Sequence, residues 1–138
     1  MVESIAVGSL DSPIGALWAA CSERGVCRVV FPREGEKQSL ERWFAGHMPT
    51  AERITRSALL EQTFKELVEY FDGTRHRFTL PLDLRGNSFE QRAWGVLTHI
   101  PYGQTVSYGS IARQLNDPQA ARAVGAACGA NPVPIIVP

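Results

Sequence analysis

The sequence has few cysteines, no excess of either charge and no long apolar run. Its three cysteines lie 6 and 101 residues apart, and these spacings form neither a disulfide framework nor a paired-cysteine metal site. Fourteen basic and fourteen acidic side chains give a formal charge of zero, so bulk charge does not indicate a nucleic-acid binder. A signal peptide and an apolar run of about 18 residues, the length that spans a membrane, are also lacking. We therefore expect a cytoplasmic protein, nuclear in a eukaryote, that does not act at a membrane.

The N-terminal part has the pattern of a small sheet. Residues 5–31 alternate β-branched and aromatic runs with turn signals, which predicts an antiparallel hairpin or a three-stranded meander. Cys21 and Cys27 flank the Ser-Glu-Arg-Gly turn, and we interpret them as packing residues of the strands. Residues 32–55 are charged and irregular, with a short helix expected near residues 39–44.

An amphipathic helix follows the irregular segment. Ser57 can cap its start, Gly73 can end it, and its apolar residues fall at helical spacing: Leu60, Phe64, Leu67, Val68 and Phe71. An extended connector comes next, and the composition then changes. We therefore predict two domains, residues 1–85 and residues 86–138.

The second domain is expected to be helical. Ser88 and Gln91 have the spacing of a capping box, which predicts a helix that runs to Ile100 and stops at the Pro-Tyr-Gly that follows. A second helix is expected over Tyr108–Leu115.

A third helix is expected after a turn, with Asp117 as its N-cap and Pro118 at its first position. Two short helices joined by a tight turn, after a longer helix, indicate a helix-turn-helix arrangement.

The third helix has almost no side-chain bulk. In the stretch PQAARAVGAACGAN, Arg122 is the only charged residue, and two glycines each cost the helix about 1 kcal/mol relative to alanine. Close packing against another helix would explain them. A slim helix could also approach the minor groove of DNA, which is about 6 Å wide, and insert the guanidinium there. Composition leaves both explanations open.

Three motifs together carry a family resemblance. The segments LDLRGNSFEQRAW, IPYGQTVSYGSIA and QAARAVGAACGANPVPIIVP resemble those of the methylated-DNA–protein-cysteine methyltransferases, which repair O6-alkylguanine in DNA. The resemblance covers most of the chain and is strong from Leu82 onward. It implies an α/β (α+β) fold. An N-terminal RNase-H-like antiparallel sheet with helices would occupy residues 1–85, and a helix-turn-helix, winged-helix-like DNA-binding domain residues 86–138.

The resemblance places the acceptor outside the sequence. In the family, a Pro-Cys-His-Arg motif follows the apolar run, and its cysteine accepts the alkyl group. Pro138 corresponds to the first residue of that motif, so we expect the nucleophile to follow it and the domain to be incomplete as given. Cys21, Cys27 and Cys128 do not match the acceptor. The 138 residues alone are therefore expected to be inactive.

The resemblance also implies roles for five residues. Arg122 matches an arginine that enters the minor groove and fills the space left by the flipped guanine. Tyr108, Gly109 and Ala121 match residues that contact the DNA, and Tyr108 also matches a tyrosine that can donate a proton toward a ring nitrogen of the base. Asn131 matches a hinge asparagine between the recognition helix and the active-site loop. From the residues alone, Tyr108 also suits an amphipathic core position and Asn131 an ordinary helix end.

The implied activity is direct, irreversible and limited to one turnover. A methyl or other alkyl group would pass from O6-alkylguanine in double-stranded DNA, with O4-alkylthymine as a further substrate, to the cysteine of a monomer, after base flipping. The resemblance implies no cofactor. One alternative is an alkyltransferase-like protein that binds the lesion without an acceptor, which the identity of residue 139 would distinguish. The other is a plain helix-turn-helix regulator, which the scarcity of base-reading side chains on the third helix disfavours.

Overall fold

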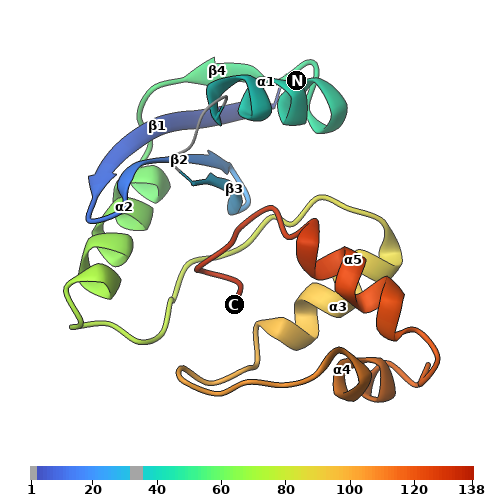
Figure 1. The fold of residues 1–138 in the computed structure, drawn as a ribbon. Helices are drawn as coiled ribbons and strands as arrows, with labels where there is room; N and C mark the ends of the chain where they lie inside the picture. The colour runs from blue at the N-terminus through green and yellow to red at the C-terminus, as the bar shows by residue number, and fades with distance from the viewer. Residues whose placement is uncertain (1–2, 32–35) are drawn as a thin grey trace. The chain divides into compact units, whose positions relative to one another are not determined.

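The structure is a computed structural model that describes residues 3–31 and 36–138, without the side chains of residues 36 and 37. It divides into two compact units between Leu84 and Arg85, and each unit is described by itself (Figure 1). The part of the expected irregular segment that covers residues 32–35 lies outside the described residues.

The first unit is built on a four-stranded sheet with the strand order β3-β2-β1-β4. The predicted meander is present, with antiparallel pairing of its three strands, β1 (Ser4–Ser12), β2 (Gly15–Ser22) and β3 (Val26–Val30). The fourth strand, β4 (Glu52–Ile54), pairs parallel to β1 and was not predicted. All three of its side chains are exposed, so it lacks the alternation of apolar and polar residues by which a strand is recognised in sequence.

Two helices cover opposite faces of this sheet, as Figure 1 shows. The helices are α1 (Glu36–His47), longer than the predicted segment, and α2 (Ala58–Phe71). Side chains alternate between the two faces of a strand. Ile5 of β1 therefore faces α1, whereas a Cβ atom placed on Gly8 of the same strand would meet Leu60 of α2. The core on the α1 side consists of Ile5, Ala20, Cys27, Val30, Leu40, Phe44 and Met48.

The predicted cap and the predicted role of two cysteines are confirmed. The Ser57 hydroxyl accepts a hydrogen bond from the Leu60 amide (3.0 Å), and Gly73 follows the end of α2 with a φ of 85°, a left-handed conformation that suits glycine. Cys21 and Cys27 are both buried, as packing residues should be.

A buried carboxylate joins α2 to the connector that follows it. Glu66 is 0% exposed, and it accepts hydrogen bonds from Gln62 and from both the amide and the hydroxyl of Thr79, each at 2.8 Å. A guanidinium nitrogen of Arg75 lies 3.4 Å from a carboxylate oxygen of Glu66. Burial acts to raise the pKa of the Glu66 carboxyl, but these hydrogen bonds and the Arg75 charge outweigh it, so the pKa lies below its ordinary value. Glu66 is therefore charged at neutral pH and fixes residues 75–79.

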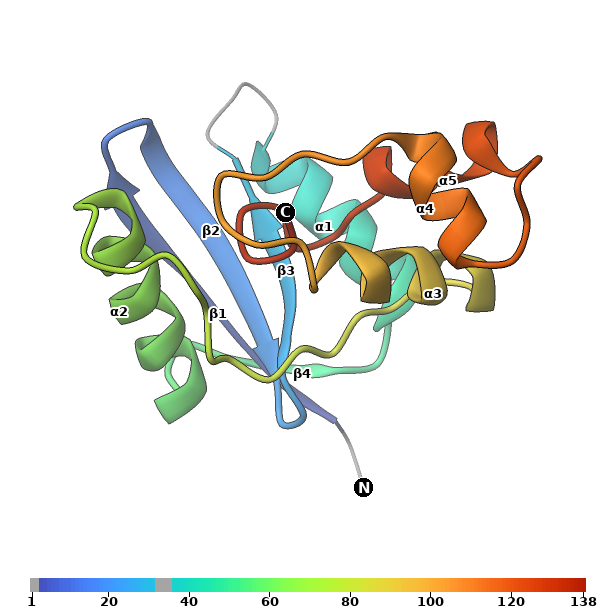
Figure 2. The ribbon, with the colours of Figure 1, turned by 90° about the horizontal axis from the view of Figure 1, so that it is seen from below.

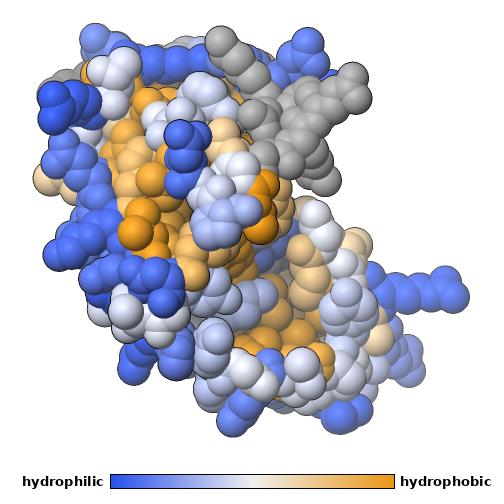
Figure 3. All heavy atoms as spheres, turned by 60° about the vertical axis from the view of Figure 1, so that its left-hand side comes forward, coloured by the Kyte–Doolittle hydropathy of each residue, from blue (hydrophilic) through white to orange (hydrophobic). Residues whose placement is uncertain are grey.

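The first unit also exposes apolar surface. Figure 3 shows hydrophobic surface on this unit lying between hydrophilic residues, and Ile14 and Val68 are among its exposed large apolar residues. Apolar atoms contribute more than half of the surface of an ordinary folded protein, so this exposure alone identifies no binding site. None of the helices in the described ranges has the length and hydrophobicity needed to cross a membrane.

The second unit consists of three helices, visible at the right of Figure 2, and α5 packs against both of the others. They are α3 (Ser88–Leu97), α4 (Tyr108–Gln114) and α5 (Ala121–Gly129). The capping box of α3 is present one residue earlier than predicted, because the Asn87 side chain accepts from the Glu90 amide (2.8 Å) and the Glu90 carboxylate accepts from the Asn87 amide (2.9 Å). The prediction that Ser88 and Gln91 form the box was wrong.

Two helix boundaries also differ from the prediction. Helix α3 ends at Leu97 rather than Ile100, because the amides of His99 and Ile100 bond to carbonyls three residues back and tighten the chain into turns. Helix α5 begins at Ala121 rather than Pro118. The Asp117 amide bonds to the Ala112 carbonyl (3.0 Å), so Asp117 closes α4 instead of capping the next helix.

Candidate functional site

The first helix of the helix-turn-helix pair, α4, begins with two residues of the predicted site. The Ser107 hydroxyl caps α4 by accepting from the Ser110 amide (3.0 Å). Tyr108 follows as the first helical residue and is 52% exposed, and Gly109 comes next. Because Tyr108 is exposed rather than buried, the alternative of an amphipathic core position is wrong for it.

A glycine of α5 lies directly against the Tyr108 ring. A Cβ atom placed on Gly125 would meet Cε2 and Cδ2 of Tyr108 at 3.1 and 3.2 Å, closer than ordinary contact. Close packing between α4 and α5 thus explains one of the two glycines in the helix. A Cβ atom on Gly129 would have nothing within 4 Å, and nothing in the structure explains that glycine.

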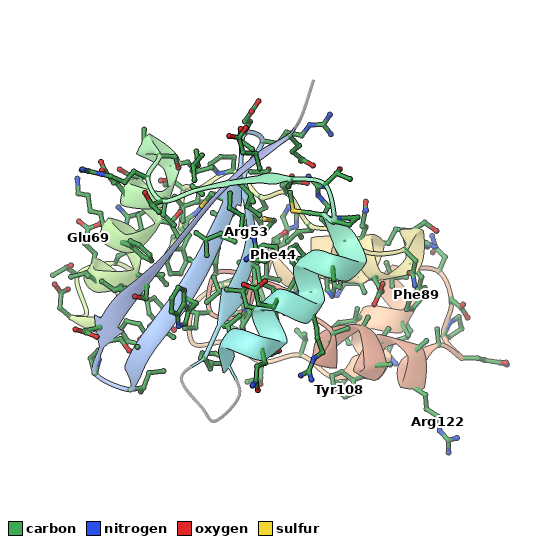
Figure 4. The ribbon with its side chains drawn as sticks, turned by 90° about the horizontal axis from the view of Figure 1, so that it is seen from above. Phe44, Arg53, Glu69, Phe89, Tyr108 and Arg122 are labelled. Atoms are coloured by element: carbon green, nitrogen blue, oxygen red, sulfur yellow. The ribbon has the colours of Figure 1, made fainter. Side chains whose placement is uncertain are left out.

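Arg122 projects from the start of α5, away from the body of the helix, as Figure 4 shows. It is exposed, and no hydrogen bond or ion pair joins its guanidinium to any residue within the described parts of the chain. Ala121 precedes it in the first turn. The other exposed residues of α5 are small: Ala123, Ala126 and Gly129. The exposed surface of α5 therefore carries small residues and a single charge, that of Arg122.

Two α3 side chains that the sequence analysis did not single out hold this pair of helices. The buried indole of Trp94 donates to the Ala127 carbonyl of α5 (2.8 Å), and Arg92 donates to the Leu115 carbonyl at the end of α4 (2.9 Å). Trp94 falls at helical spacing among apolar residues, which predicts burial, but no sequence signal shows which carbonyl an indole will reach.

Asn131 joins the end of α5 to the C-terminal segment. Its side-chain amide donates to the Val137 carbonyl (2.8 Å), and its side-chain oxygen accepts from the Val133 amide (2.9 Å). The Val137 amide in turn donates to the Val133 carbonyl (2.9 Å). Asn131 therefore does more than end the helix, because its side chain closes residues 133–137 into a compact loop.

None of the three cysteines has the environment of a nucleophile. Cys27 is buried, and burial raises the pKa of the thiols of Cys21 and Cys128. A thiol with a raised pKa stays protonated at neutral pH and reacts slowly, because the thiolate is the nucleophile. Nor do the described residues include a cluster of His, Cys, Asp and Glu side chains arranged to hold a metal ion.

The structure brings some of the predicted site residues together and separates others. Tyr108 and Gly109 share one end of α4, Ala121 and Arg122 share the start of α5, and Asn131 lies just beyond the other end of α5. A shallow cavity of about 410 Å³ lies between α3 and the end of α4. It is lined by Arg92, Gly95, Val96, His99, Gln114, Leu115 and Asn116, so none of the predicted site residues lines it.

Two family models match the chain, one for each unit. Residues 5–84 match the ribonuclease-like domain of 6-O-methylguanine DNA methyltransferase, and residues 88–138 match the DNA-binding domain of the same family. These matches confirm the predicted fold class, a ribonuclease-like domain of strands and helices followed by a helical DNA-binding domain.

Curated relatives carry a related name. The chain is 43% identical over 101 residues to the inducible methylated-DNA–protein-cysteine methyltransferase of Bacillus subtilis, a match that covers 73% of the chain and 56% of that protein. It is 41% identical to the methylated-DNA–protein-cysteine methyltransferase of Mycobacterium bovis, over 94% of the chain and 73% of that protein. The chain thus spans little more than half of the first relative and about three quarters of the second.

Solved structures share the fold. The crystal structure of Mycobacterium tuberculosis O6-methylguanine methyltransferase superposes with a TM-score of 0.80 at 36% identity, over 97% of this chain and 75% of that one. A structure of Mycobacterium tuberculosis OGT in complex with DNA gives 0.76 at 37% identity, over 94% and 73%.

Proposed function

Because the chain belongs to the 6-O-methylguanine DNA methyltransferase family, we propose that this protein repairs DNA by moving an alkyl group from the O6 atom of guanine to one of its own cysteines. Its relatives are named for transfer to a protein cysteine, and one structural neighbour was solved with DNA. The observation that carries the proposal is the surface of α5, where an exposed Arg122 without a polar partner in the described residues stands among alanines and glycines. This is a surface that fits a narrow groove.

The first step is extrusion of the damaged base. The O6 alkyl group is inaccessible inside a duplex, so the nucleotide must leave the stack, which costs a few kcal/mol. We propose that Arg122 enters the minor groove and occupies the vacancy. The small residues around it allow α5 to approach the backbone, and the start of α5 at Ala121 together with Tyr108 and Gly109 would contact the DNA.

The second step is displacement at the alkyl carbon. A cysteine thiolate attacks that carbon, the S–C bond forms, and the C–O6 bond breaks with its electron pair passing to the base. Guanine would leave as an anion, so a donor that neutralises this charge lowers the barrier. We propose that the Tyr108 hydroxyl gives its proton to a ring nitrogen and recovers one from water. Its 52% exposure at the start of α4 supports access to a flipped base.

We propose that the acceptor is not among the cysteines of residues 1–138. Cys21 and Cys27 are buried in the first unit, and the thiol pKa of Cys128 is raised by burial. We therefore propose that the acceptor follows Pro138, where the family resemblance predicts it. Asn131 would then position the approach to that cysteine through its bonds to Val133 and Val137.

Further parts of the proposal follow from the same resemblance. We propose a domain boundary near residue 85, a monomer, and action on double-stranded DNA inside the cell, in the cytoplasm or in the nucleus of a eukaryote. O4-alkylthymine is proposed as a second substrate because its alkyl group is bound in the same way to an exocyclic oxygen.

The test is repair of a duplex that carries one O6-methylguanine. Incubation with the intact natural protein should convert the lesion to guanine, measured by nucleoside analysis, in an amount that never exceeds one per protein molecule. Arg122→Ala and Tyr108→Phe should each slow conversion, by about 10-fold or more, the scale of a lost flipping or proton-donating group.

Two variants provide matched controls. Arg24→Ala removes the charge of an exposed arginine in the first unit, and Tyr102→Phe removes the hydroxyl of another exposed tyrosine. Both should convert the lesion at the natural rate. Tight binding of the lesion without conversion would instead identify a lesion-binding protein, and repeated turnover would refute transfer to the protein.

A further inference from the structure

The Tyr108 ring lies close to the backbone of α5 at Gly125. The ring lies over Gly125, where a Cβ atom would come within 3.1 Å of Cε2 and 3.2 Å of Cδ2. No hydrogen bond holds the Tyr108 side chain to any residue in the described segments. Tyr108 is 52% exposed, and its ring lies against the Gly125 backbone, so this contact bears on where the hydroxyl lies.

Gly125 also lies about one helical turn after Arg122, on the same helix. The two groups with which the proposed function handles a flipped base are therefore linked through α5. Arg122 projects from this helix, as Figure 4 shows, and the ring of Tyr108 lies against the same helix at Gly125.

We propose that Gly125 is a positioning residue for Tyr108, one that lets the phenol ring lie against α5 so that its hydroxyl reaches the flipped base when Arg122 is in the groove. This inference rests on the proposed function. It also gives a reason for a glycine in the middle of a helix, where glycine lowers helix stability relative to alanine. Gly129, at the end of the same helix, meets nothing and has no such role.

Alanine at position 125 should move the ring rather than unfold the domain. The added methyl group must displace Tyr108 by a few tenths of an ångström, and an exposed side chain can give way by that much. Misplacement of a reacting group by about 1 Å can cost about 100-fold in rate, so a shift of this size should cost about 3- to 10-fold.

The experiment compares Gly125→Ala with Gly46→Ala in the intact natural protein. Both variants replace a helical glycine with alanine, but only the first meets the Tyr108 ring, whereas Gly46 is an exposed residue of α1 in the first unit with nothing within 4 Å of an added Cβ atom. Single-turnover repair of a duplex containing O6-methylguanine should slow about 3- to 10-fold for Gly125→Ala and stay within about 2-fold for Gly46→Ala. The affinity of Gly125→Ala for the same duplex should stay within about 2-fold of the natural value, because a shift of a few tenths of an ångström leaves the Tyr108 ring in contact with the DNA and alters only the reach of its hydroxyl.

A double-mutant cycle with Tyr108→Phe separates positioning from direct contact with DNA. If Gly125 acts through the hydroxyl of Tyr108, then Gly125→Ala should slow repair no further in the Tyr108→Phe background. The same loss in both backgrounds, a fall in affinity, or equal rates for Gly125→Ala and Gly46→Ala would overturn the inference alone. Absence of repair by the natural protein would overturn the proposed function, and the inference with it.

Discussion

Replacement of Asn131 tests the loop at the end of α5 most directly. The Asn131 side chain makes two hydrogen bonds, to the amide of Val133 and to the carbonyl of Val137, and these residues are 0% and 1% exposed. Asn131→Ala removes both partners and leaves two poorly solvated backbone groups unpaired. Each such group costs about 1–3 kcal/mol, and water that hydrates the two groups offsets part of this cost. Residues 133–137 should therefore lose about 2–4 kcal/mol of local stability.

Amide hydrogen exchange measures this loss at single residues. Removal of its acceptor should raise the exchange rate of the Val133 amide by about 30-fold or more, since a factor of ten corresponds to about 1.4 kcal/mol. Asn131→Asp is the matched control, because a carboxylate still accepts from Val133 but cannot donate to Val137. It should keep the Val133 amide protected while losing the bond to Val137. An unchanged Val133 amide in Asn131→Ala would refute the reasoning, because the side chain would then not hold the loop.

Three further predictions concern the charge of the interface and the two buried polar contacts. The affinity for undamaged duplex should depend weakly on salt, and Arg122→Ala should weaken that dependence further, because the chain has no net charge and α5 carries one arginine. Titrations at several salt concentrations measure this dependence, and a slope that corresponds to about eight phosphate contacts would contradict the prediction. Because the pKa of Glu66 is lowered in the folded state, its contribution to stability should be complete above the unfolded value of about 4.3 and be lost as the pH falls through the folded value. Thermal melts between pH 7 and pH 3 should therefore show an acid loss that is smaller in Glu66→Gln, and at pH 7 this variant should be less stable by about 1.5–3 kcal/mol. Trp94→Phe should lower the free energy of unfolding by about 1–3 kcal/mol, because the Ala127 carbonyl loses its buried donor, and a stability equal to the natural one in chemical denaturation would show that water replaces the indole.

Local signals explain what could be predicted of the fold. The alternating pattern of residues 5–31 identifies three strands, and the Ser57 cap with the apolar spacing behind it identifies α2. β4 has only three exposed residues and forms because β1 offers it a free edge, which is information from another part of the chain. The start of α5 was missed for a similar reason, since the Asp117 amide is taken by α4.

The candidate site divides in the same way between local and non-local information. Composition singles out Arg122, whereas the family resemblance singles out Tyr108 and Asn131 and gives all three residues their roles. The sequence also raises the question of two glycines in a helix, but it cannot show that Gly125 faces an aromatic ring while Gly129 faces nothing. Contacts between helices depend on how they cross, and single-sequence patterns do not contain that geometry.

The residue that receives the alkyl group is the most direct test of the account. The intact natural protein would be incubated with a duplex containing O6-methylguanine and then digested, and the methylated peptide would be sequenced by mass spectrometry. The account predicts one methyl group per molecule, on a cysteine that follows Pro138. A methyl group on Cys21, Cys27 or Cys128, or restored DNA with no methylated peptide, would contradict it.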